Sequence, residues 1–258
     1  MMTVSSPEAT TPRPVTMITG GTRGIGAATA IRLAAAGHDL VLGYHRDESA
    51  AERTADRVRE LGASCITVAG DLTRPTDIDA LFAAAAGLGR PTAVINNAGA
   101  TLTFAPLAET SVEAIQRTIE VNLTAATLVA RAAVRTMGRS YGGDGGVIVN
   151  ISSGAATLGS PGEYVYYAAA KAGLDTLTLG LGKEVAGNGI RVVGVAPGLV
   201  DTSIHASAGD PGRVDRMASQ LPIGRAADPD EIAASIAWLV SDDASYVTAT
   251  TLRVAGGR

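Results

Sequence analysis

The sequence predicts an α/β fold: a three-layer sandwich in which a doubly wound, mostly seven-stranded parallel sheet lies between two layers of helices. Three observations predict it. Short apolar runs alternate with helical stretches along almost the whole chain, which favours parallel strands joined by right-handed crossovers. A glycine-rich turn separates the first apolar run from the first helical stretch. Only 3% of the residues are aromatic while 31 are glycine, which favours helices packed closely on a sheet over an aromatic-rich β-sandwich.

Composition narrows the class of protein. The chain has 258 residues, of which 46% are hydrophobic and 18% charged, so it is able to bury a large core. The net charge is −4 without a run of like charges, which argues against a nucleic acid or an anionic membrane as partner. No stretch approaches the length of an apolar membrane span, and we expect a soluble, cytoplasmic protein.

The N-terminal residues and the single cysteine are not expected to take part in catalysis. Residues 1–14 contain three prolines and no signal-peptide core, which predicts a disordered tail before a single domain at 15–258. The single cysteine, Cys65, falls in an apolar run and is interpreted as a small buried side chain rather than a nucleophile.

The first half of the chain alternates three strands with three helices. The strands are expected at Val15–Thr19, Asp39–Tyr44 and Cys65–Ala69. A helix follows each: an alanine-rich one that Gly37 ends, a charged one at Glu48–Leu61, and one from Pro75 to about Ala86.

The second half continues the alternation with longer helices. Strands are expected at Ala93–Ile95, Val147–Ile151, Ile190–Ala196 and Thr251–Val254. One long helical stretch fills Ser111 to Met137, and another contains Tyr167 and Lys171. Asp228 is the predicted N-cap of a helix that runs to Val240, with Pro229 at its first position.

The glycines Gly20, Gly21, Gly24 and Gly26 lie between the first strand and its helix. Small residues there let the backbone approach a pyrophosphate, and the helix N-terminus supplies free N–H groups and the positive end of a dipole. A glycine cluster alone also makes ordinary turns. Between a strand and a helix it indicates a Rossmann-type dinucleotide site.

Tyr167 and Lys171 are four residues apart on a predicted helix, so they share one face. A nearby ammonium favours the phenolate and would lower the pKa of the tyrosine toward neutrality, which suits a general acid/base acting on a hydroxyl or carbonyl oxygen. The pair also arises by chance on ordinary amphipathic helices. Its interpretation depends on the rest of the chain.

Polar or small residues follow the strands at the edge where an open parallel sheet binds ligands. They are the glycines after the first strand, Tyr44-His45-Arg46, Asp71, Asn96-Asn97-Ala98-Gly99, Ser152-Ser153 and Pro197-Gly198.

These motifs together resemble the short-chain dehydrogenase/reductase family. The segments that carry the resemblance are Thr19–Gly26, Asn96–Gly99, Ser153, Tyr167-x-x-x-Lys171 and Pro197-Gly198, in the order and spacing of that family, over nearly the whole chain from Val15 to Gly257. The resemblance implies an NAD(P)-dependent enzyme that transfers a hydride between the nicotinamide and a carbonyl or hydroxyl group.

The resemblance also implies a role for four residues. Tyr167 would be the acid/base, and Lys171 would hold the nicotinamide ribose and lower the tyrosine pKa. Ser153 would bind the substrate oxygen, and Asn122 would order a water that relays protons. A solvent-facing Asn122 is the alternative, and Ser152 is the alternative to Ser153. Among Tyr164, Tyr166 and Tyr167 only the last has the lysine partner, and Tyr164 would line the substrate pocket.

Cofactor preference is predicted from the end of the second strand. An acid there would bind the ribose of NAD, but the sequence has Tyr44-His45-Arg46, with Asp47 beyond them. We expect NADP(H) to be preferred over NAD(H), with Arg23 and Arg46 on the 2′-phosphate. The full expected cofactor set is Gly20, Thr22, Arg23, Gly24, Ile25, Gly26, His45, Arg46, Asp71, Leu72, Asn97, Ala98, Gly99, Tyr167, Lys171, Pro197, Gly198, Val200 and Thr202.

The substrate side is less readable. Residues 200–222 are expected to form a mobile lid that has no cation pair for binding a specific acid. His205 is expected to line this lid or to lie on the surface. No cluster of residues in the sequence has metal-ligand spacing. A 3-oxoacyl-thioester reductase and a sugar or polyol dehydrogenase both fit; for the former, Arg135, Arg139 and Arg213 are candidate contacts for acyl carrier protein. An NADPH-binding regulatory protein without turnover is the alternative from another class. The family resemblance implies a homotetramer.

Overall fold

The computed structural model describes residues 12–258, and the sheet at its centre has the predicted class. Seven parallel strands lie in the order β3-β2-β1-β4-β5-β6-β7. The strands are β1 (Val15–Ile18), β2 (Asp39–Tyr44), β3 (Cys65–Ala69), β4 (Pro91–Asn96), β5 (Gly146–Ile151), β6 (Ile190–Pro197) and β7 (Thr250–Val254). The order reverses between β1 and β4, and ligands of such sheets bind beyond the strand ends at this point.

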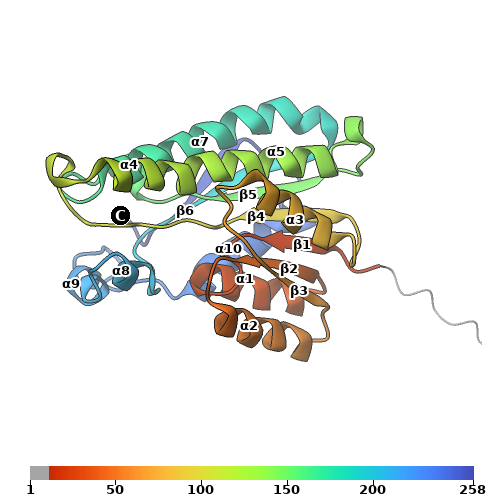
Figure 1. Cartoon of the computed structure of the whole chain (residues 1–258), viewed down its shortest axis with the longest axis horizontal. Coiled ribbons are helices and arrows are strands. Elements are labelled where there is room, and N and C mark those ends of the chain that lie inside the picture. The colour runs from red at the N-terminus through yellow and green to blue at the C-terminus, as the bar shows by residue number, and fades with distance from the viewer. Residues whose placement is uncertain (1–11) are drawn as a thin grey trace, which may run out of the picture.

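Two layers of helices cover the sheet (Figure 1). One layer contains α1 (Gly24–Ala35), α2 (Glu48–Glu60) and α10 (Pro229–Val240). The other contains α3 (Pro75–Ala85), α4 (Val112–Ile119), α5 (Ala125–Met137) and α7 (Val165–Val185). Each layer has its own apolar core against the sheet, and the strand side chains that point to either face are almost all aliphatic. Burial on both faces explains why the strands are continuous apolar runs.

Short helical segments connect these elements. They are α6 (Ala155–Leu158), α8 (Ile204–Ser207), α9 (Arg213–Ala218), and the single turns η1 (Leu107–Glu109), η3 (Arg139–Tyr141), η4 (Ala186–Asn188) and η5 (Asp242–Ala244). In Figure 1, α8 and α9 lie beside the carboxyl ends of the strands, at the same end of the molecule as the C-terminus. They belong to the 200–222 segment.

The predicted long helix at Ser111–Met137 is interrupted once. A π-turn, η2 (Glu120–Thr124), separates α4 from α5. The ends of the elements otherwise differ from the expected ones by a few residues. The Asp228 cap is present as a full capping box. The Asp228 side chain accepts a hydrogen bond from the Asp230 N–H, and the Glu231 side chain accepts one from the Asp228 N–H.

The predicted tail lies mostly outside the described residues, since only 12–14 of 1–14 are described. These last residues pack on the fold: Arg13 donates to the Ala34 carbonyl and pairs with Asp39, whose N–H donates to the Pro14 carbonyl. Within residues 12–258, no helix combines the length and the apolar character that crossing a membrane requires.

Candidate functional site

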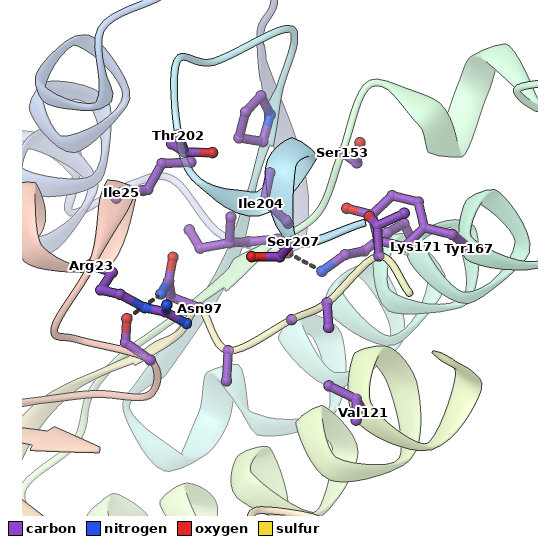
Figure 2. Close-up of a pocket in the computed structure, with 18 of the residues that line it drawn as sticks. Arg23, Ile25, Asn97, Val121, Ser153, Tyr167, Lys171, Thr202, Ile204 and Ser207 are labelled. Carbon is purple, nitrogen blue, oxygen red and sulfur yellow. Dashed lines mark hydrogen bonds between the residues drawn. The ribbon is translucent and has the colours of Figure 1, made fainter. Parts of the chain in front are cut away.

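A cavity of about 690 Å³ lies beyond the carboxyl ends of the strands. The glycine turn after β1, the ends of β2 to β6 and the 200–222 segment all line it. It brings together every residue of the expected cofactor set except Gly26, and three of the four expected catalytic residues: Ser153, Tyr167 and Lys171. Figure 2 shows these three close together on one side of the cavity, with Arg23, Ile25 and Asn97 on the other. Gly26 and Asn122 lie behind its walls.

Helix α7 carries both members of the tyrosine–lysine pair on the face that lines the cavity. Tyr167 and Lys171 are 8% and 3% exposed. The Lys171 Nζ donates to the carbonyl of Ile151, the last residue of β5, at 2.8 Å, and lies 5.8 Å from the centre of the Tyr167 ring. The strand end therefore fixes the ammonium beside the phenol.

Burial dominates the protonation of this pair. It raises the pKa of Tyr167 above the ordinary value; the neighbouring Ser153 hydroxyl opposes this rise. Burial also lowers the pKa of Lys171 to about 8, against a smaller opposing effect of Asp175. The expectation that Lys171 lowers the tyrosine pKa is therefore wrong for the protein alone. Removal from water disfavours the charged form of each group, which is why burial moves the two pKa values in opposite directions.

The two serines after β5 are in different environments. The Ser152 hydroxyl is buried and donates to the Lys171 carbonyl at 3.3 Å, so it fastens β5 to α7. The Ser153 side chain lines the cavity and accepts a hydrogen bond from the Ala155 N–H at 3.1 Å. Both serines contribute to the cavity lining, but the Ser152 hydroxyl is engaged by the Lys171 carbonyl, whereas the Ser153 hydroxyl lies beside Tyr167.

Asn122 is fully buried, so the solvent-facing alternative is wrong. It lies in the π-turn η2, and its Nδ2 donates to Thr118 O at 2.9 Å, the carbonyl that a helical N–H at 122 would otherwise use. The same side chain donates to Ala100 O and accepts from Ala100 N, at 2.7 and 3.2 Å. A Cβ on Gly99 would lie 2.8 Å from Asn122 Oδ1 and 3.3 Å from Lys171 Nζ. This close approach requires glycine, and it places Gly99 between the amide and the ammonium.

The glycine turn is held tightly against the end of β4. Asn97 Nδ2 donates to the carbonyls of Thr19 and Gly20, at 2.9 and 3.0 Å. A Cβ on Gly26 would lie only 2.1 Å from Gly20 O. Helix α1 begins directly after the turn with no side-chain cap and no acid in its first turn. Its free N–H groups and dipole therefore favour an anion such as a pyrophosphate, and the turn fits a dinucleotide.

The end of β2 is basic, and its nearest acid is already engaged. Asp47 caps α2 by accepting from the Ala50 N–H, and it pairs with Arg23 at 3.6 Å. Arg46 lines the cavity and is exposed, and no hydrogen bond or ion pair within residues 12–258 engages its side chain. His45 Nε2 lies 3.9 Å from Asp71 Oδ2.

Asp71 has a partner that the sequence did not reveal. Arg117 of α4 donates to Asp71 Oδ2 at 2.7 Å and also to Thr73 and Glu120 at 2.8 Å. Burial alone would raise the pKa of Asp71, but hydrogen bonds from Arg117 and Thr73 outweigh it and hold this pKa well below its usual range. The carboxylate is therefore an ionised acceptor. No spacing rule connects positions 71 and 117, which lie on different elements.

The other end of the cavity has an aromatic and cationic wall. Phe104, Tyr164 and Arg213 line it, with the Arg213 guanidinium 4.6 Å from the Phe104 ring and 5.5 Å from the Tyr164 ring. Tyr166 lies nearby but is structural, since it is buried and its hydroxyl donates to Thr103 O at 2.9 Å.

This wall corrects two expectations. Arg213 is 5% exposed and pairs with Glu163, so it is not a surface contact, and the 200–222 segment does contain a cation that faces the cavity. Arg135 and Arg139 are exposed but lie at the opposite end of the sheet, next to the start of β5 and β6, and do not surround the cavity mouth. Thr202 lies against Gly24, and the His205 side chain is outside the described structure.

The comparisons with known proteins cover nearly the whole chain. A family model described as enoyl-(acyl carrier protein) reductase matches residues 20–258. The "Uncharacterized oxidoreductase YgfF" of Escherichia coli K12 is 43% identical over 95% of this chain and 99% of its own length. The "3beta-hydroxysteroid dehydrogenase 1" of Eggerthella lenta is 39% identical over 93% of this chain and 92% of its own. A short-chain dehydrogenase of Burkholderia cenocepacia, solved in complex with NADP, superimposes with a TM-score of 0.86 at 30% identity, over 95% of this chain and 97% of that one.

Proposed function

Because the chain belongs to the short-chain dehydrogenase/reductase family of oxidoreductases, which act on hydroxyl or carbonyl groups with a nicotinamide cofactor, we propose that it transfers a hydride between NADP(H) and a small carbonyl or alcohol substrate. The observation that carries this proposal is the convergence of Ser153, Tyr167 and Lys171 at one side of a cavity whose other side is the glycine turn.

The roles follow from where each group lies. The bound nicotinamide supplies or accepts the hydride. Tyr167 gives its proton to the substrate oxygen in reduction and recovers it in oxidation; its raised pKa keeps the phenol protonated before reduction. Ser153 donates a hydrogen bond to the same oxygen and stabilises the negative charge that develops on it.

Lys171 and Asn122 support the phenol. The ammonium of Lys171 stabilises negative charge on Tyr167 after the proton has left, and it would hold the ribose of a bound cofactor. Asn122 fixes the loop at Ala100, with Gly99 between it and Lys171. Its proposed role is to order a water on the path by which the proton is replaced. Both roles depend on burial, because water would weaken each interaction.

We propose that NADP(H) is preferred over NAD(H). The capping and ion-pair contacts of Asp47 make it a poor partner for a ribose diol, while the Arg46 side chain faces the cavity and has no partner among residues 12–258. Arginine suits a phosphate because of its fixed charge and its forked donors. Arg23, with His45 beside it, completes the basic surroundings of the predicted 2′-phosphate site.

We further propose that 15–258 is one domain, that the 200–222 segment is a lid over the substrate, and that the protein is a tetramer. Exposed apolar side chains on α7, α10, β7 and the turn before β7 support the last point: Leu179, Trp238, Tyr246 and Leu252. Sedimentation equilibrium checks it, and a monomeric mass at micromolar concentration contradicts it.

The test of the function pairs two neighbouring tyrosines. Tyr167→Phe should lower kcat for NADPH-dependent ketone reduction by about 10²–10⁴-fold, since it removes the proton donor and little else. Tyr166→Phe removes a hydroxyl that donates to Thr103 O and does not line the cavity, and it should leave kcat within a few-fold. NADPH binding, measured by fluorescence titration, should be unchanged in both. NADPH binding without reduction of any carbonyl compound, equally in wild type and Tyr167→Phe, would instead support the regulatory alternative.

A further inference from the structure

Three segments that are far apart in the chain meet at Arg213. They are the loop after β4 with Phe104, the loop before α7 with Glu163 and Tyr164, and helix α9 of the 200–222 segment. The Phe104 and Tyr164 rings are 5.0 Å apart at 58°, and the guanidinium lies against both. Tyr164 in turn meets Tyr167 edge-on at 5.2 Å. The wall formed by Phe104, Tyr164 and Arg213, here called the aromatic wall, therefore contacts the predicted acid/base directly.

The charge of the aromatic wall is cancelled within it. Arg213 Nη1 and Nη2 donate to the two carboxylate oxygens of Glu163, at 2.9 and 2.7 Å, and Nη2 also reaches the Tyr164 hydroxyl at 3.3 Å. A forked pair of this kind is held firmly, and a buried guanidinium without its carboxylate would be costly. Of the guanidinium, Nε alone has no hydrogen-bond partner within residues 12–258. Because the pair has no net charge, we expect it to attract an anionic substrate much less than a free guanidinium would.

Aliphatic side chains line the cavity beside the aromatic wall, together with hydroxyl groups such as those of Ser160, Ser203 and Ser207. The aliphatic ones are Leu102, Leu158 and Ile204, of which the first two are 40% and 43% exposed overall. Exposed leucines at a cavity favour an apolar ligand surface. Arg253 and Arg258 also line the cavity but are exposed, so water screens their charges.

We propose that the Arg213–Glu163 pair determines specificity: it positions the aromatic wall while cancelling its own charge, so that the site selects uncharged, apolar ketones and secondary alcohols over carboxylate-bearing ones. The inference rests on the proposed function. It assigns Arg213 and Glu163 as positioning residues, which act through Phe104 and Tyr164.

The test compares two ketones of one shape. Cyclohexanone with a methyl group opposite the carbonyl is the neutral substrate, and cyclohexanone with a carboxylate at that position is the anionic one. The measured quantity is the ratio of kcat/KM for the two with NADPH, which does not depend on the fraction of active enzyme. Wild type should favour the methyl compound by at least about tenfold, since a carboxylate would be desolvated without a partner.

Charge variants of the pair should move this ratio in opposite directions. Glu163→Gln leaves the guanidinium uncompensated and should shift the ratio toward the carboxylate by about tenfold. Arg213→Met leaves Glu163 uncompensated and should shift it further toward the methyl compound. Arg216→Gln is the matched control: it removes a charge from the same helix at an exposed side chain and should leave the ratio unchanged.

The outcomes separate this inference from the proposed function. A wild-type preference for the carboxylate, or no preference, overturns the inference, as does a ratio that Glu163→Gln does not move. If both variants fail to fold, as thermal unfolding would reveal, the wild-type ratio still decides. If neither ketone is reduced, the inference fails, while Tyr167-dependent reduction of some other carbonyl compound would leave the proposed function standing.

Discussion

The two ends of the cavity are built in different ways. The part of the cofactor end that faces the predicted pyrophosphate consists of main chain and mostly short side chains from one continuous segment, the turn after β1, and Asn97 holds this turn against the next strand of the sheet. The substrate end consists of large side chains from three separate segments, joined by the buried Arg213–Glu163 pair. Backbone geometry determines the first end, and side-chain packing and charge determine the second.

This difference predicts how each end tolerates change. At the glycine turn, where neighbouring atoms leave no room for a Cβ, a substitution should weaken cofactor binding through steric overlap, whatever the substrate. At the aromatic wall, a substitution should change activity through lost positioning or uncompensated charge, and the size of the change should depend on the substrate. The following experiments compare the two ends, together with the catalytic centre between them.

The largest effect is expected at the centre. Ser153→Ala removes the hydroxyl that faces the cavity and should lower kcat by about 10²–10³-fold, as for other donors to a developing oxyanion. Ser152→Ala removes only a 3.3 Å bond to the Lys171 carbonyl and should cost less than about tenfold. Steady-state kinetics on both variants measure this. If Ser152→Ala is the more damaging, the assignment of the two serines is reversed.

The next effect tests the backbone-built end. Gly26→Ala places a Cβ 2.1 Å from the Gly20 carbonyl, so the turn must move. NADPH should bind about 10- to 100-fold more weakly, since overpacking of this kind costs about 1–3 kcal/mol. Gly187→Ala, where a Cβ meets nothing within 4 Å, is the control for the exchange itself. Unchanged affinity in Gly26→Ala would mean that the turn does not form the pyrophosphate site.

A smaller effect should appear at the basic edge of the cofactor end. Arg46→Gln should raise KM for NADPH by about tenfold and leave KM for NADH unchanged, because only the former has the 2′-phosphate. Arg53→Gln, the same charge change on an exposed face of α2, should alter neither. Equal or better use of NADH by the wild type would contradict the proposed preference.

The smallest effect concerns stability and pH. The pKa of Lys171 is about 8 in the folded protein against an ordinary 10.5, so between these values the folded state holds fewer protons than the unfolded state. Stability from this group therefore rises with pH, by about 1 kcal/mol from pH 7 to pH 9, or about 2–4 °C in Tm. Tyr167, whose pKa is raised above 10, does not titrate in this range.

Comparison with Lys171→Met isolates this contribution. The difference in Tm between wild type and variant, measured in the absence of cofactor, should shift in favour of the wild type as the pH rises. A shift in the opposite direction, toward lower wild-type stability at pH 9, would mean that the folded protein stabilises the charged form of Lys171 instead of disfavouring it.

The sequence alone determined the fold class and the backbone-built end. Apolar runs alternating with helices define a parallel sheet, since strands buried on both faces must be apolar throughout. The glycine turn and the pair Tyr167 and Lys171 are local patterns: a strand-turn-helix segment and one helical turn bring their members together whatever the rest of the chain does. The same holds for the Asp228 cap, a contact between near neighbours in sequence.

Only the tertiary structure decided the side-chain contacts between distant segments. The π-turn that buries Asn122, the Arg117–Asp71 bond and the Arg213–Glu163 pair each join residues whose approach depends on how helices and loops pack. The protonation of the tyrosine–lysine pair belongs to the same class. Spacing predicted an attraction that lowers the tyrosine pKa, but burial, which only the packed structure sets, raises it.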